Sequence, residues 1–317
     1  MAETGQVESS KTAAAVDAEL RAKRPWRTDP HYFEKVQVSS LALLKMAMHA
    51  REGEPLEVMG LLQGKVAEKT FIVTDAFALP VEGTETRVNA GAGANEFMVE
   101  YMSGSKDAGD EKAVVGWYHS HPGYGCWLSG IDVSTQMLQQ TYQDPYVAIV
   151  IDPTRTAATG RVEIGAFRTY PENYTPPSSE ESAYQSIPLN KIEDFGVHCK
   201  RYYPVDVSFF RSDVDEAVLP LLWNKYWISV LSSSPLHSNA EYTANRINDL
   251  RKKLSEVEQG LFHGSGLGGR EFFADASKGK AKEHKIGQAS ADAAKLSSEI
   301  LSSSAIEYNK MKLFSFK

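Results

Sequence analysis

Apolar residues in the first two-thirds of the chain follow two spacings, one typical of helices and one typical of strands. A first helix is expected to begin at Ser39 or Ser40 and to end at Gly53 and Pro55. Its apolar positions recur at helical spacing: Leu41, Leu44, Ala47 and Met48.

Short apolar runs between turn residues predict strands, namely residues 57–64, 70–79, 113–118, 146–151 and 162–167. The run 146–151 is unbroken and rich in β-branched residues, which is typical of a strand buried inside a sheet. Asp152 and Pro153 are expected to stop it. Helical periodicity over residues 131–142 and 212–231 places helices among and after these strands, so the pattern predicts an α/β domain.

Polar and glycine-rich segments interrupt this pattern. Residues 1 to about 24 are polar and alanine-rich, and residues 82–96 are broken by glycines, so we expect a partly disordered N-terminus and a mobile loop. Residues 178–200 have mixed polarity and are expected to be irregular. From about Ala240 the chain is polar and helical, with a glycine-rich interruption near residue 264. The sequence therefore predicts a helical tail after the α/β domain.

Composition limits the classes of function. Apolar residues make up 42% and charged residues 24%, which is the balance of a soluble globular protein. The net charge of -7 gives no sign of a nucleic-acid partner. No apolar stretch approaches the ~18 residues needed to span a bilayer, and the N-terminus lacks a secretion signal. With only 2 cysteines, a disulfide framework is not expected, and we place the protein in the cytoplasm and nucleus.

Candidate chemistry begins at the end of the predicted strand 113–118. His119 and His121 are two residues apart, and alternate residues of a strand face the same side. Both imidazoles can therefore reach one metal ion. Pro122 ends the strand, so the pair is expected at a sheet edge that a ligand can approach.

Three further residues complete a hydrolytic site. Asp132, at the start of a predicted helix, offers the third ligand, and two histidines with one carboxylate leave a coordination position of zinc for water. Glu57 is the candidate acid–base group that takes and returns a proton. Ser129 is placed to donate a hydrogen bond to a developing oxyanion.

Each of these residues also has a structural explanation. Two surface histidines on a strand would give the same His-x-His pattern, and Glu57 could be a solvated strand end. Ser129-x-x-Asp132 could be a helix-capping box, alone or in addition to its catalytic role. The His-Glu-x-x-His signature is absent, which excludes a thermolysin-type site.

The run His119-Ser120-His121-Pro122, followed by Ser129 and Asp132 and preceded by Glu57, resembles the JAMM motif of the MPN+ metalloproteases. The resemblance implies one zinc ion held by His119, His121 and Asp132, with Glu57 as acid–base group and Ser129 stabilising the oxyanion. It also implies an MPN fold, a mixed sheet with flanking helices like that of cytidine deaminases.

A narrower resemblance, to the catalytic subunits of the constitutive-photomorphogenesis (COP) signalosome, rests on several longer runs, residues 57–60, 83–89, 123–128, 187–196 and 222–227. It implies an isopeptidase that removes the neddyl modifier from cullins, and so regulates cullin-RING ubiquitin ligases. Other signalosome subunits, especially a second MPN-domain subunit, and neddylated cullins are the implied partners. The alternatives are a deubiquitinase of the proteasome-lid type and a non-catalytic MPN scaffold; the scaffold class lacks one or more of the metal ligands.

These observations divide the chain into three parts. Residues 1–33 form an N-terminal segment, residues 34–235 the MPN+ domain, and residues 236–317 a helical tail for complex assembly. The resemblance implies insertions that shape the substrate groove near residues 78–112 and 178–200. Packing of the tail within the chain is the alternative to packing with partner subunits.

The first insertion carries a candidate regulatory pair, Glu85 and Arg87. A carboxylate on a mobile loop can take the open zinc position and silence the free subunit. A solvated pair of loop charges is the alternative explanation.

Overall fold

The computed structural model describes residues 22–80, 96, 113–171, 174, 176, 186–232, 234–262 and 276–314. The strands within them are β1 (Lys35–Ser39), β2 (Met59–Ala67), β3 (Thr70–Ala78), β4 (Ala113–Ser120), β5 (Val147–Asp152), β6 (Glu163–Thr169) and β7 (Tyr202–Phe210). The helices are α2 (Ser40–Gly53), α4 (Gly130–Gln143), α5 (Pro153–Thr159), α6 (Ile192–His198), α7 (Asp213–Ser232), α8 (Pro235–Ser238), α9 (Ala240–Phe262) and α10 (Ala276–Phe314). Short 3₁₀ turns are η1 (Pro25–Arg27) and η2 (Leu189–Lys191).

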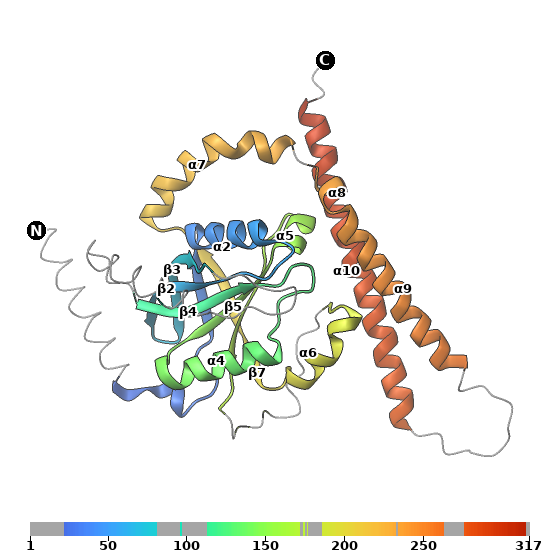
Figure 1. Cartoon of the computed structure of the whole chain (residues 1–317), viewed down its shortest axis with the longest axis horizontal. Helices are drawn as coiled ribbons and strands as arrows, with labels where there is room; N and C mark the ends of the chain where they lie inside the picture. The colour runs from blue at the N-terminus through green and yellow to red at the C-terminus, as the bar shows by residue number, and fades with distance from the viewer. Residues whose placement is uncertain are drawn as a thin grey trace, which may run out of the picture.

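The described strands close into one barrel in the order β1-β3-β2-β4-β5-β6-β7, and β7 pairs back onto β1. β1 is parallel to β3 and β7, β4 is parallel to β5, and the other neighbours are antiparallel. Helices α2 and α5 lie on one side of the sheet and α4 on the other (Figure 1). Every residue of β5 is buried, as predicted from its unbroken apolar run. The predicted mixed sheet with flanking helices is confirmed.

Helix α2 begins as predicted, because the Ser39 hydroxyl accepts a hydrogen bond from the backbone N–H of Ala42 at 3.1 Å. The apolar positions whose spacing indicated the helix are not the ones that face the core. The fully buried residues are Ala42, Met46 and Ala50, whereas Met48 is 54% exposed. Apolar residues surround much of this helix, so their spacing alone did not select the buried face.

Four further elements depart from the sequence prediction. Strand β7 lies where no strand was predicted, and β1 precedes the first predicted helix. Helix α5 starts at Pro153, where the sequence was expected only to stop β5. Helix α6 occupies part of the segment 178–200 that was predicted to be irregular.

Several predictions fall outside the described residues. Residues 81–95 and 97–112 hold most of the first expected insertion, including Glu85 and Arg87. The second expected insertion is described only from residue 186 onward.

The C-terminal helices pack on the barrel domain of the same chain. Helices α9 and α10 lie side by side, and α10 rests against α5 (Figure 1). Ser303 of α10 donates a hydrogen bond to the Ala158 carbonyl at 2.5 Å, and Lys295 lies 3.5 Å from Glu163. One side of the tail therefore packs within the chain. Within the described part of the chain, no helix is both long and apolar enough to cross a membrane.

Candidate metal centre

The end of strand β4 positions two histidines. His119 lies in β4 and pairs with Met59 of β2 on one side and Val150 of β5 on the other. His121 follows the strand, and its backbone N–H still bonds to the Ile151 carbonyl at 2.9 Å, so the extended conformation continues. Alternation along this backbone turns both imidazoles to the same side, where both are buried.

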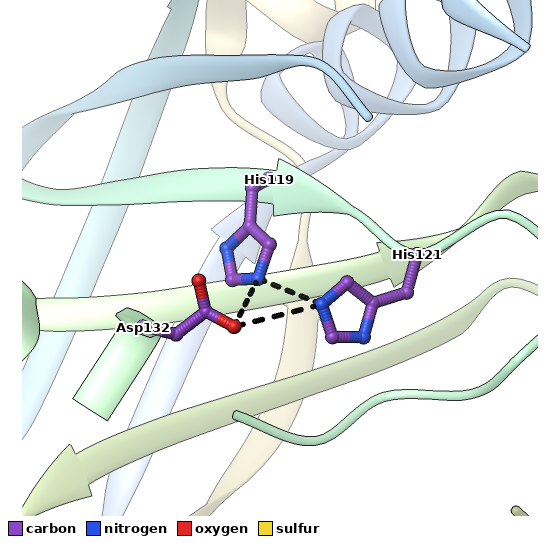
Figure 2. A group of neighbouring side chains, drawn as sticks. All are labelled: His119, His121 and Asp132. Atoms are coloured by element: carbon purple, nitrogen blue, oxygen red, sulfur yellow. Dashed lines mark hydrogen bonds and ion pairs between the residues drawn. The ribbon is translucent and has the colours of Figure 1, made fainter. Parts of the chain in front are cut away.

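Helix α4 brings a carboxylate to the same point. Oδ2 of Asp132 lies 3.3 Å from Nε2 of His119 and 3.7 Å from Nε2 of His121, and the two nitrogens are 3.0 Å apart (Figure 2). Two ligands of a tetrahedral zinc, each about 2.0–2.1 Å from the metal, lie about 3.3 Å apart. The spacing of the three atoms therefore fits one such ion.

Ser129 holds Asp132 in place. Its hydroxyl lies 2.6 Å from Oδ2 of Asp132, and its backbone N–H donates to the same oxygen at 2.8 Å. The Asp132 N–H is directed back to the Ser129 hydroxyl, so the two residues form the capping box of α4. The structural explanation for this pair is therefore present together with the approach of Asp132 to the histidines.

Neighbouring groups orient both rings. Nδ1 of His121 lies 3.0 Å from the carbonyl oxygen of Gly125 and donates to it, which leaves the Nε2 lone pair directed at Asp132 and His119. The indole of Trp117 stacks on His119 with centroids 4.6 Å apart and an interplanar angle of 15°. The His121 hydrogen bond is of the kind that selects the tautomer of a metal-binding histidine.

The charges of the group complement one another. Burial on its own raises the pKa of Asp132, but His119 and His121 outweigh it and hold that pKa well below its usual value. Burial lowers the pKa of His119, yet the Asp132 charge outweighs it, with a smaller contribution from Glu57, so the pKa of His119 is raised. The group therefore favours a positive charge between the imidazoles and the carboxylate, which is the position a metal cation would take.

Glu57 lies beside the histidines because the start of β2 is fastened to the end of β4. The Ser120 N–H bonds to the Val58 carbonyl at 2.9 Å, and the Val58 N–H bonds to the Ser120 hydroxyl at 2.9 Å. The Glu57 side chain is buried, and the Tyr124 hydroxyl donates a hydrogen bond to its Oε1. Burial and the Glu57 charge both raise the pKa of Tyr124, so its phenol remains a donor.

Comparison with known proteins identifies the family. A family model described as JAB1/Mov34/MPN/PAD-1 ubiquitin protease matches residues 31–145, and one described as Cop9 signalosome subunit 5 C-terminal domain matches residues 232–315. COP9 signalosome complex subunit 5 of Drosophila melanogaster is 56% identical over 291 residues, which cover 92% of this chain and 86% of the relative. The chain belongs to the COP9 signalosome subunit 5 family.

Other relatives with this name come from distant organisms. Subunit 5a of Arabidopsis thaliana is 57% identical over 287 residues, covering 90% of this chain and 79% of the relative. Subunit 5 of Dictyostelium discoideum is 60% identical over 240 residues, which cover 76% of this chain and 72% of the relative. The resemblance to the MPN+ metalloproteases and to their signalosome branch is confirmed. In this family the JAB/MPN domain is that of a JAMM-type, metal-dependent isopeptidase.

The structure of this subunit 5 family member brings together the three predicted metal ligands, His119, His121 and Asp132. Ser129 contacts one of them, Asp132. Glu57 lies close enough for its charge to act on His119.

Three groups at or behind this site were not predicted from the sequence: the Tyr124 hydroxyl, the Gly125 carbonyl, and the Asp152 carboxylate that accepts the Gly125 N–H. The sequence carried a signal for the first two, because glycines flank Tyr124 at positions 123 and 125 and indicate a turn. In the structure both glycines adopt positive φ angles, 83° and 91°.

Proposed function

We propose that this chain is the zinc-dependent isopeptidase of a signalosome and that it removes the neddyl modifier from cullins. The convergence of two imidazoles and one carboxylate beside a buried glutamate carries this proposal. The names of the relatives support the signalosome assignment.

The chemistry divides between the metal and the chain. A bound zinc lowers the pKa of water to ~7 and polarises a carbonyl group. His119, His121 and Asp132 would hold the ion. The Glu57 carboxylate accepts the proton of the attacking water and then gives it to the lysine amine as the isopeptide bond breaks. Tyr124 donates to Glu57 and so holds that carboxylate in one orientation.

Ser129 has two roles that compete for one proton. Its hydroxyl contacts Oδ2 of Asp132 in the structure. To donate to the oxyanion of the substrate, the hydroxyl must turn away from Asp132, whose Oδ2 keeps the hydrogen bond from the Ser129 backbone N–H. The backbone donor therefore keeps Asp132 oriented when the hydroxyl turns to the substrate.

Regulation by the first insertion remains part of this proposal. Glu85, beside Arg87, would take the open metal position in the free subunit and leave it when partners assemble. If Glu85→Ala and Thr84→Ala gave the isolated chain no increase in activity, this regulatory role would be removed.

Assembly with other signalosome subunits, including a second MPN-domain subunit, is the proposed role of the C-terminal helices. These helices keep large apolar side chains exposed to solvent: Ile247, Leu254, Leu301, Tyr308 and Met311. Such residues on long helices are suited to a helical bundle with partner chains.

The test compares substrates for the assembled complex. We expect zinc-loaded complex to cleave neddylated cullin much faster than ubiquitin chains, and we expect the metal-stripped complex to be inactive until zinc returns. Preference for ubiquitin chains would favour the proteasome-lid type of activity. Absence of cleavage with zinc bound would favour the scaffold.

A further inference from the structure

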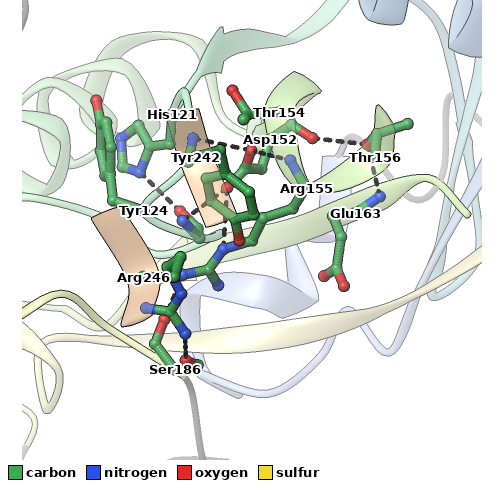
Figure 3. Close-up of polar contacts among 12 residues, drawn as sticks. His121, Tyr124, Asp152, Thr154, Arg155, Thr156, Glu163, Ser186, Tyr242 and Arg246 are labelled. Atoms are coloured by element: carbon green, nitrogen blue, oxygen red, sulfur yellow. Dashed lines mark hydrogen bonds and ion pairs between the residues drawn. The ribbon is translucent and has the colours of Figure 1, made fainter. Parts of the chain in front are cut away.

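Asp152, the last residue of β5, is fully buried and uses both carboxylate oxygens. Oδ1 accepts hydrogen bonds from the backbone N–H of Gly123 at 3.0 Å and of Arg155 at 2.9 Å. Oδ2 accepts from the backbone N–H of Gly125 at 2.9 Å and lies 3.4 Å from Nε of Arg155 (Figure 3). Oδ1 caps helix α5, whereas Oδ2 binds only the Gly125 backbone and the guanidinium.

These contacts lead directly to a metal-site histidine. Asp152 holds the N–H of Gly125, and the C=O of the same residue accepts the hydrogen bond from Nδ1 of His121 at 3.0 Å. A Cβ atom at Gly125 would lie 2.7 Å from Nη1 of Arg155 and would strain a backbone with φ of 91°. The guanidinium therefore packs against the turn at Gly125, where both its closeness and the positive φ favour glycine.

Arg155 connects this turn to the C-terminal helices. Its Nη2 donates to the carbonyl of Ser186 at 2.5 Å, and the Ser186 hydroxyl receives a hydrogen bond from Arg246 of α9. Tyr242 of α9 covers the other glycine of the turn, since its ring lies 3.4 Å from where a Cβ at Gly123 would be. Figure 3 shows these side chains gathered around Arg155, with α9 contributing Tyr242 and Arg246.

We propose that Asp152 and Arg155 are positioning residues that fix the His121 imidazole for metal binding. Helix α9 holds them in place through Tyr242 and Arg246. This inference rests on the proposed metal-dependent function. Groups that hydrogen-bond a metal-binding histidine directly, as the Gly125 carbonyl does here, typically change metal affinity 10–100-fold when removed, and Asp152 acts through that group. The C-terminal helices, which carry the proposed assembly surface, would then be linked physically to the metal centre.

The first test is Asp152→Asn in the intact chain. Asparagine keeps one carboxamide oxygen to cap α5, but its amide nitrogen cannot accept the Gly125 N–H. We expect the zinc affinity, measured by competition between the protein and a chromogenic chelator, to fall about 10–100-fold. The visible spectrum of the cobalt-substituted protein should change as well, since one imidazole is less constrained.

Asp144→Asn is the matched control. Asp144 also pairs with a buried arginine, Arg168, at 2.9 Å, but it lies before the start of β5, at the opposite end from Asp152. We expect it to lower the thermal midpoint of the metal-free protein without changing zinc affinity. Equal loss of zinc affinity in both variants, or no loss in Asp152→Asn, would overturn the proposal while leaving the proposed function intact. Absence of zinc binding by the wild-type chain would instead overturn the proposed function.

A second pair of variants tests helix α9 and does not disturb the buried carboxylate. Tyr242→Ala removes the ring that covers Gly123, whereas Tyr242→Phe keeps the ring and removes only the hydroxyl that contacts Glu299 at 3.2 Å. We expect weaker zinc binding in Tyr242→Ala and wild-type binding in Tyr242→Phe. Wild-type zinc affinity in Tyr242→Ala would show that the ring of Tyr242 takes no part in positioning His121.

Discussion

The Ser129 hydroxyl lies 2.6 Å from Oδ2 of Asp132, the same carboxylate oxygen that faces both imidazoles of the metal site. A helix cap and a metal ligand are therefore one structural unit. The helix cap orients the same carboxylate that faces the two imidazoles, as an outer hydrogen bond to a metal ligand does.

Replacement of Ser129 tests its second role. We expect Ser129→Ala to lower kcat by ~10²–10³ at saturating zinc, because the substrate oxyanion loses a donor. The lost cap should also reduce the free energy of unfolding by about 1 kcal/mol. Ser134→Ala, which removes an exposed hydroxyl from the same helix, serves as the control for kinetics and denaturation. Wild-type kcat in Ser129→Ala would leave Ser129 as a helix cap only.

Glu57→Gln should separate proton transfer from metal binding. The amide cannot accept the water proton, so we expect isopeptide cleavage to fall by at least ~10² while zinc content is unchanged. Asp132→Asn should instead lose zinc, as measured by elemental analysis of the purified protein. Glu52→Gln, at an exposed position of α2, is the control for activity. Cleavage by Glu57→Gln at the wild-type rate would remove Glu57 from the mechanism.

Tyr124 is expected to act through Glu57. Tyr124→Phe deletes the hydroxyl that donates to the carboxylate, so Glu57 can rotate away from its working orientation. We expect kcat to fall about 10–100-fold with little change in KM and none in zinc content. Tyr142→Phe, on an exposed part of α4, provides the comparison. If Tyr124→Phe altered KM alone, the tyrosine would belong to substrate binding.

Protonation of His49 should lower the free energy of unfolding in mild acid. Burial lowers the pKa of His49 below its usual 6.5, and the Glu52 charge opposes this only in part. Burial raises the pKa of Tyr118, whose hydroxyl lies 2.9 Å from Nδ1 of His49 and donates to the neutral ring. Since the unfolded chain binds the proton more tightly, the free energy of unfolding decreases as the pH falls from about 6.5 through the folded-state pKa.

Urea unfolding of wild type and His49→Gln at several pH values measures this effect. The difference between their free energies of unfolding should change between pH 7 and pH 5, in the direction that wild type loses stability faster. His237→Gln, at an exposed site in α8, should follow wild type. Parallel curves for wild type and His49→Gln would contradict the assignment.

The local sequence pattern was sufficient to predict those site residues that lie within a few positions of one another in the chain. His119 and His121 follow from strand alternation, and Ser129 with Asp132 follows from a helix start. Asp152 could not be found in this way, because its role depends on β5 lying parallel to β4, which places residues about 30 apart in sequence beside each other. Read alone, Asp152-Pro153 indicated only a strand end, although it is the cap and first residue of α5.

The fold shows the same limit. The run 146–151 was predicted because every residue of β5 is buried and the apolar signal is continuous. Strand β7 carries Pro204 and exposes several of its residues, so its pattern is weak until pairing with β1 and β6 defines it. Helix α6 buries none of its residues and therefore leaves no helical periodicity in the sequence.

Crystals of the zinc-loaded protein, measured across the zinc absorption edge, test the central claim most directly. We predict one anomalous peak in contact with Nε2 of His119, Nε2 of His121 and an oxygen of Asp132, with the fourth position open to solvent. A zinc-loaded crystal without this peak, or with a fourth protein atom occupying that position in the assembled complex, would contradict the assignment of a hydrolytic metal centre.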